Sequence, residues 1–139
     1  MKIRGLLLDV DKNPGSVKEV EVEEENLNDF YDILNCNIIT IVSRKIGDRE
    51  FDIVCDDEGL LRSDYHVSAI ASNGRYELVG NLFICNHYKE NLTSLSKEDI
   101  QYISNYVVIS SVWNPESKVI RTSPVLTNVG YAIYDVYDV

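Results

Sequence analysis

The sequence predicts a single α+β domain, residues 1–139, in which a mostly antiparallel sheet of several hairpins is covered by two helices, at about 26–35 and 96–105. Three observations lead to this prediction. Hairpin signals recur along the chain, two amphipathic segments begin at strong capping residues, and strands and helices do not alternate regularly. A chain of this length with 45% hydrophobic residues can bury a core without disulfides.

The centre of the predicted sheet is a hairpin made of residues 38–44 and 49–55. Both segments are rich in β-branched residues, and Gly47 in the connecting turn can adopt a positive φ. Phe51 and Ile53 lie on one face of the second strand while charged residues occupy part of the other face. We therefore expect Phe51 to be a core residue.

Further strands are predicted on both sides of this hairpin. Residues 3–22 form a first hairpin, because the turn formers at 9–15 separate two β-rich segments. Residues 67–71 and 76–84 form a second, because Asn73-Gly74 is the dipeptide that fits a two-residue hairpin turn.

The C-terminal part of the sequence predicts strands at 107–112 and 118–122, joined by a turn at 114–117, and a final strand at 130–139.

Two segments carry helix signals. In residues 26–35, Asn26 can cap a helix whose apolar stripe is Leu27, Phe30, Tyr31 and Leu34. In residues 96–105, Ser96 and Asp99 form the pattern of a capping box. We expect both helices to pack on the sheet.

The composition of the chain limits the classes of function that are expected. The formal net charge is −10, and residues 1–58 carry 15 acidic against 7 basic side chains. Such a surface repels duplex nucleic acid, so binding to DNA is not expected. An odd number of widely spaced cysteines favours free thiols in the cytoplasm, and no apolar run is long enough to indicate a signal peptide or a membrane span.

No motif of an enzyme or a metal site stands out. Asp9, Asp11 and Asn13 imitate the first ligands of a calcium loop, but the required glycine and the final carboxylate are missing. Cys85 and His87 are two residues apart on a predicted strand, which does not create a contact between nucleophile and base. We expect a protein without catalytic residues, metal or cofactor.

A set of arginine and aromatic residues near the central hairpins favours binding of a nucleotide. Arginine recognises phosphates, and aromatic rings stack on bases. A glycine before Asn81 would also allow a ligand to approach the backbone closely. The candidate ligand-binding residues are Arg44, Arg49, Arg62, Tyr65, His66, Tyr76 and Asn81. The alternative is that they are ordinary surface arginines and half-buried strand tyrosines.

Four motifs carry a family resemblance: GLLLD at 5–9, EFDIVCDDEGLL at 50–61, GNLFI at 80–84 and LSKEDI at 95–100. Over about residues 3–112, the sequence resembles an uncharacterised domain-of-unknown-function family of small proteins from phages, prophages and conjugative elements. The resemblance implies a cytoplasmic protein of a mobile element that acts against host defence. It implies no catalytic residues, because none are established for the family.

Together, the residues and the resemblance predict a non-catalytic counter-defence protein that sequesters a small nucleotide-type immune signal in the cytoplasm of the host. We expect it to be a homo-oligomer, because a groove shared by two copies buries a ligand better than one small domain does. The alternative is an acidic protein that blocks a host defence protein by direct binding or by mimicry of nucleic acid.

Overall fold

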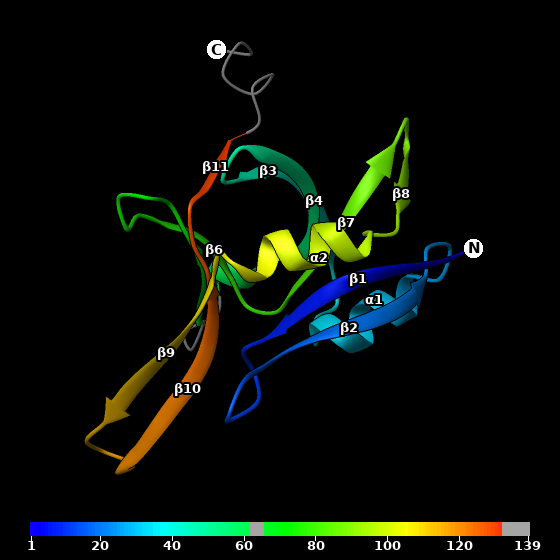
Figure 1. Ribbon diagram of the computed structural model, residues 1–139. Coiled ribbons are helices and arrows are strands. Elements are labelled where there is room, and N and C mark those ends of the chain that lie inside the picture. Colours follow the sequence, from blue (N-terminus) through cyan, green and yellow to red (C-terminus); the bar gives the residue numbers. More distant parts are fainter. Residues whose placement is uncertain (62–65, 132–139) are drawn as a thin grey trace.

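The computed structural model describes residues 1–61 and 66–131 of the chain, and these fold into two β-sheets with two short α-helices (Figure 1). The prediction of one sheet covered by helices is wrong. Strands dominate the fold, each α-helix has only 8 residues, and a separate second sheet packs beside the first. The protein has a β-rich fold.

The first sheet is antiparallel throughout, with the strand order β11-β3-β4-β7-β1-β2, and β8 pairs with the far end of β7. Its centre is the predicted hairpin, now β3 and β4, and its first hairpin is β1 and β2. The strands are β1 (Lys2–Asp9), β2 (Ser16–Glu23), β3 (Ile39–Ile46), β4 (Arg49–Asp56), β7 (Leu82–Tyr88), β8 (Asn91–Thr93) and β11 (Val129–Tyr131).

The second sheet has the order β6-β5-β10-β9. The predicted β5–β6 hairpin is present, but its turn is a three-residue loop, 72–74, and not the expected two-residue turn: the N–H of Ala71 donates to the oxygen of Arg75, and Gly74 has a φ of +85°. A longer hairpin, β9 and β10, projects from the body of the molecule (Figure 1). The strands are β5 (Val67–Ile70), β6 (Tyr76–Val79), β9 (Val107–Asn114) and β10 (Val119–Leu126).

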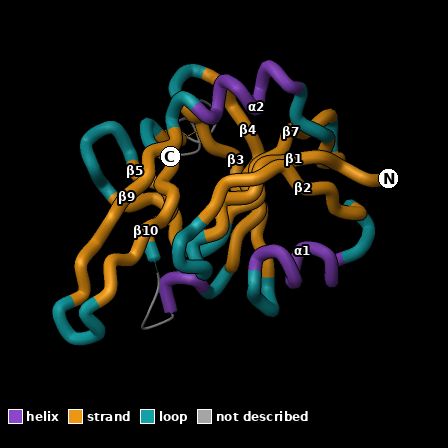
Figure 2. The backbone as a smooth tube through the Cα atoms, turned by 60° about the horizontal axis from the view of Figure 1, so that its bottom comes forward, coloured by secondary structure: helices purple, strands orange, loops and turns teal. Residues whose placement is uncertain are grey.

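Both predicted helices exist, and they lie on opposite sides of the first sheet (Figure 2). Helix α1 (Leu27–Leu34) begins at its Asn26 cap and ends where Asn35 adopts a left-handed conformation. Helix α2 (Lys97–Ser104) begins with the predicted capping box of Ser96 and Asp99. A 3-10 turn, η1 (Gly59–Leu61), follows β4.

The core has two parts because the first sheet is apolar on both faces. On one face, Phe30 and Leu34 of α1 pack against Phe83 of β7. On the other face, Phe51 and Ile103 belong to a cluster that also includes residues of the second sheet. Phe51 is 2% exposed, so the prediction that it is a core residue is confirmed.

Among the described strands the chain passes from one sheet to the other four times, between β4 and β5, β6 and β7, β8 and β9, and β10 and β11, and local sequence patterns do not reveal these changes. The predicted strand 76–84 is split at Gly80, whose φ is +77°, so that β6 belongs to the second sheet and β7 to the first. A parallel pairing between Ala69 of β5 and Leu126 of β10 joins the two hairpins of the second sheet. These long-range pairings explain why a single sheet was the wrong expectation.

Candidate ligand-binding groove

A groove of about 530 Å³ lies on one face of the second sheet. Val112 and Arg121 are directly opposite each other in the β9–β10 register, as are Ser110 and Ser123. Opposite residues in an antiparallel pair share a face, so every second residue of this hairpin faces the groove. The lining residues are His66, Val67, Ile70, Tyr76, Val108, Ser110, Val112, Asn114, Arg121, Ser123 and Val125.

Arg121 supplies the permanent positive charge among these lining residues. Its Nη2 donates a hydrogen bond to the backbone oxygen of Val10, which fixes the guanidinium against the β1–β2 turn. Its Nε is buried without a hydrogen-bond acceptor in the described part of the chain. The ion pairs found among the described residues do not involve Arg121. No carboxylate of the described residues therefore lies within ion-pair distance of its guanidinium.

The electrostatics of the groove differ from those of the whole protein. The chain has a net charge of −10, yet the described lining contains no Asp, Glu, Lys or Cys. Apolar surface from valines surrounds one guanidinium, three hydroxyl-bearing side chains, one amide and one imidazole. Such an apolar concavity with a few polar groups is typical of small-molecule sites, and its charge favours an anion.

Two of the predicted ligand-binding residues lie at this groove. His66 precedes β5, and its backbone oxygen accepts a hydrogen bond of 2.8 Å from the backbone N–H of Gly80. Tyr76 begins β6 and is 67% exposed, so its ring is accessible to a ligand. The predicted residues Arg62 and Tyr65 lie outside the described residues.

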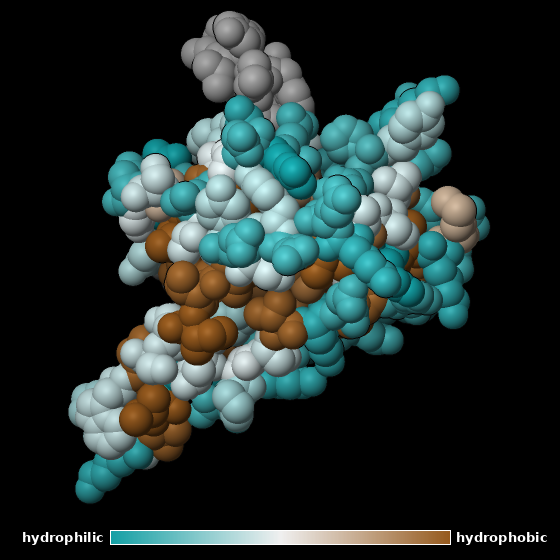
Figure 3. Space-filling model, in the orientation of Figure 1, coloured by the Kyte–Doolittle hydropathy of each residue, from teal (hydrophilic) through white to brown (hydrophobic). Residues whose placement is uncertain are grey.

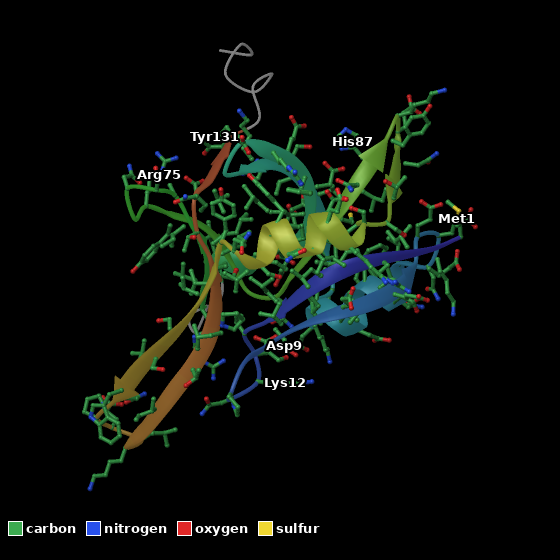
Figure 4. The ribbon with its side chains drawn as sticks, in the orientation of Figure 1. Met1, Asp9, Lys12, Arg75, His87 and Tyr131 are labelled. Atoms are coloured by element: carbon green, nitrogen blue, oxygen red, sulfur yellow. The ribbon has the colours of Figure 1, made fainter. Side chains whose placement is uncertain are left out.

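The other two predicted arginines lie in the first sheet and stack on tyrosines. The guanidinium carbon of Arg44 is 4.8 Å from the ring centroid of Tyr131, and that of Arg49 is 4.3 Å from the ring centroid of Tyr102. Arg75 Nη2 also donates to Tyr131 Oη at 3.5 Å, and Figure 4 shows these two residues side by side. Arg44 and Arg49 do not line the groove.

Asn81 has structural contacts. It is 3% exposed, its Oδ1 accepts a hydrogen bond of 2.8 Å from the backbone N–H of Val10, and its Nδ2 donates one of 3.1 Å to the backbone oxygen of Ile33. These bonds connect the point where the chain changes sheets with the β1–β2 turn and with α1. The side chain therefore lies in the interior and does not line the groove.

A polar cluster elsewhere on the first sheet resembles a catalytic arrangement only superficially. Asp52 Oδ1 accepts a hydrogen bond of 2.8 Å from Ser43 Oγ and lies 3.1 Å from His87 Nδ1. The serine thus contacts the carboxylate and not the imidazole, which is the wrong order for a nucleophile activated by a base. Burial raises the pKa of the nearby Cys85 thiol to about 12, so this cysteine is not an activated nucleophile.

Sequence reasoning missed Arg121, although a signal for it was present. Arg121 is the only charged residue in segments 107–114 and 119–126. A lone charge in two long, otherwise uncharged strands is unusual, because exposed strand faces normally carry several charged side chains.

Within residues 1–61 and 66–131, no group of three or more His, Cys, Asp or Glu side chains is arranged to hold a metal ion. None of the helices in the same ranges combines the length and the hydropathy that a membrane-spanning helix needs.

The chain was compared with known proteins. No curated protein and no solved structure shows significant similarity to it. The profile of the domain of unknown function DUF3846 matches residues 2–107, which include the whole first sheet except β11, both helices and the β5–β6 hairpin. Most of the β9–β10 hairpin lies beyond the matched region. The chain therefore belongs to the DUF3846 family of domains of unknown function.

Proposed function

We propose that the protein binds a small nucleotide-type molecule in the groove of the second sheet and sequesters it without chemical change. The observation that carries this proposal is the charge of Arg121, which has no carboxylate partner in the described part of an otherwise acidic protein. A phosphate would supply the missing negative charge and accept hydrogen bonds from the guanidinium.

The remaining lining residues suit the other parts of a nucleotide. Tyr76 and His66 offer rings on which a base stacks, and the valines of β9 and β10 offer apolar surface beside them. Ser110 and Ser123 offer hydroxyls that can bind a ribose or a phosphate. The groove thus combines an anion contact with surfaces for an aromatic ring.

The same lining argues for binding without catalysis. General acid–base hydrolysis of a phosphate ester uses one positioned group that takes a proton from the attacking water and a second that protonates the leaving oxygen, or a metal ion. The described lining offers a single imidazole, that of His66, and neither a carboxylate nor a thiol. We therefore propose that the ligand leaves the protein unchanged.

The biological role follows from the resemblance to proteins of mobile elements. We propose that the protein is encoded by a phage or another mobile element, that it acts in the cytoplasm of the bacterial host, and that its ligand is a signalling nucleotide of host immunity. Removing such a signal would prevent activation of the defence effector. The identification of the DUF3846 family is compatible with this role and does not specify it.

The proposal is tested by recovery of the ligand. Purified protein is incubated with a panel of nucleotides that includes cyclic dinucleotides and larger cyclic oligonucleotides, and free ligand is measured after ultrafiltration and again after heat denaturation. Depletion that is reversed by denaturation, with the ligand intact, supports sequestration. A new product indicates an enzyme, and no depletion favours the acidic blocking protein, for which the charge of −10 is the main observation.

Variants locate the site. Arg121→Ala should weaken capture by about ten- to a hundredfold, which corresponds to about 1.5–3 kcal/mol for one charge-assisted contact. Tyr76→Ala should also weaken capture, and it is exposed enough to leave the fold intact. Arg49→Ala is the matched control, because Arg49 lies on the first sheet and stacks on Tyr102. Equal losses in all three variants, or losses in the control alone, would place the site elsewhere.

A further inference from the structure

Strand β9 is an outer strand of the second sheet with an unusual sequence. It pairs with β10 on one side, and no described strand pairs with its other side. Its eight residues, VVISSVWN, include no charge. The outer strand β2 is protected by Lys18, Glu19 and Glu21, while β6 and β11 have only four and three residues. A long, uncharged edge strand is a template for pairing with another strand.

The hydrogen bonds of β10 show which backbone groups of β9 point outward and are available for pairing with another strand. The oxygen of Thr122 accepts a bond from the N–H of Gly15, and the N–H of Thr122 donates to Asn13 Oδ1. Both groups of Thr122 therefore point away from β9, so Thr122 and its partner Ser111 are a non-hydrogen-bonded pair. The N–H and C=O of Ser111 must then point outward. By alternation, the same holds for Ile109 and Trp113.

The side chains along this edge are apolar and exposed. Ile109 is 60% and Trp113 is 55% exposed on one face of the hairpin, and Val112 is 61% exposed on the other. Figure 3 shows the brown, hydrophobic surface on this projecting hairpin. Contiguous exposed apolar patches are rare on soluble monomeric proteins, and large ones mark interaction sites.

The distribution of charge favours a second copy of this chain as the partner of β9. Two copies of a protein with a net charge of −10 repel each other over most of their surfaces. Near β9 this repulsion is weak, because the strand is uncharged and the charged residues of the following segment 115–122, Glu116, Lys118 and Arg121, sum to +1. The outward backbone groups of Ile109, Ser111 and Trp113 are also symmetric about Ser111, which is what antiparallel pairing of identical strands requires.

We propose that two copies of this chain associate through antiparallel pairing of their β9 strands, with the two-fold axis at Ser111. In this register, Ile109 of each copy lies opposite Trp113 of the other, and β-branched and aromatic residues form favourable cross-strand pairs. The second sheets then join into one sheet with four strands from each copy. The axis is perpendicular to the sheet, so both ligand grooves lie on the same side of it.

This inference specifies the homo-oligomer expected from the sequence, and it does not depend on what the groove binds. The test is the mass in solution, measured by light scattering or sedimentation over a range of protein concentrations. The wild-type protein should have a mass about twice the 15.8 kDa of the chain. A monomer at all concentrations would overturn the proposal.

Variants of β9 identify the interface. Ser111→Pro removes one outward N–H while leaving the β10 pairing intact, because proline is tolerated on edge strands. Ile109→Lys places a charged side chain of each copy directly opposite Trp113 of the other copy. Both should yield monomers with a wild-type circular dichroism spectrum. The matched control is Ile41→Lys, which changes an isoleucine of similar exposure, 49%, on the first sheet and should remain dimeric.

The register is tested by cross-linking. Directly opposite hydrogen-bonded residues have Cα atoms about 5.5 Å apart, but their Cβ atoms are farther apart than the roughly 3.5–4.5 Å that a disulfide needs, so a short bis-maleimide cross-linker is used. The cross-linker should join Ser111→Cys into a covalent dimer, whereas Ser117→Cys at the hairpin turn should not be cross-linked. The native cysteines do not interfere, because Cys36, Cys55 and Cys85 are all buried. A dimer that persists in Ser111→Pro and in Ile109→Lys would show that a different surface pairs. If Ser111→Pro misfolds, Ile109→Lys alone decides.

Discussion

Replacing Asn81 with alanine should destabilise the protein by about 1–4 kcal/mol. The substitution removes the acceptor of the Val10 N–H, which is 0% exposed, and a buried unsatisfied donor costs about 1–3 kcal/mol. It also removes the donor to the Ile33 oxygen, whose loss adds up to about 1 kcal/mol. The N–H of Asp11 also donates a bond of 3.3 Å to Asn81 Oδ1. Losing this bond costs little, because the same N–H keeps its bond of 3.1 Å to Asp9 Oδ1.

The assay is thermal or urea unfolding followed by circular dichroism. For a chain of this length, about 3–4 °C is lost per kcal/mol, so the melting temperature should fall by roughly 3–16 °C. Asn73→Ala is the matched control. Its Oδ1 accepts a bond of 3.0 Å from the Arg75 N–H in an exposed turn, and its loss should cost less than about 1 kcal/mol.

Two results would refute this reasoning. If Asn81→Ala melts within the error of Asn73→Ala, the buried N–H of Val10 has found another partner and the structural role is wrong. If Asn81→Ala is stable but no longer captures ligand, Asn81 is a binding residue, as the sequence alone predicts.

Two further predictions concern titrating groups. Burial and a hydrogen bond to Asp48 raise the pKa of Tyr102 to about 12. Because this folded-state pKa lies above the ordinary value of 10.0, Tyr102 stabilises the protein below pH 10 and loses that contribution as the pH rises towards 12. The urea midpoint of Tyr102→Phe should therefore fall less steeply over this pH range than that of the wild-type protein. A parallel decline in both proteins would contradict this. Burial also raises the pKa of Cys55 to about 11 and that of Cys85 to about 12. A thiol reagent at neutral pH should therefore label these two residues only after unfolding. Rapid labelling of the native protein would show that they are accessible.

The sequence by itself determined the local structure. Caps located both helices within a residue, since Asn26 and Ser96 satisfy backbone N–H groups from within the same short segment. The Asn73-Gly74 turn and the alternation around Phe51 likewise depend on residues that are close in the chain. The same local information identified His66 and Tyr76, which line the groove because they flank the β5–β6 hairpin.

The tertiary structure decided how these pieces combine. Whether β5 joins β4 or β10 depends on the free energy of packing between Ala69 and Leu126, residues 57 positions apart, and no local propensity encodes it. The sheet change at Gly80 then divides one predicted strand and turns Asn81 inward, whereas the β5–β10 pairing brings Arg121 to the groove beside the β5–β6 hairpin. Long-range strand pairing therefore created the second sheet and the candidate site, because both exist only when distant segments share one core.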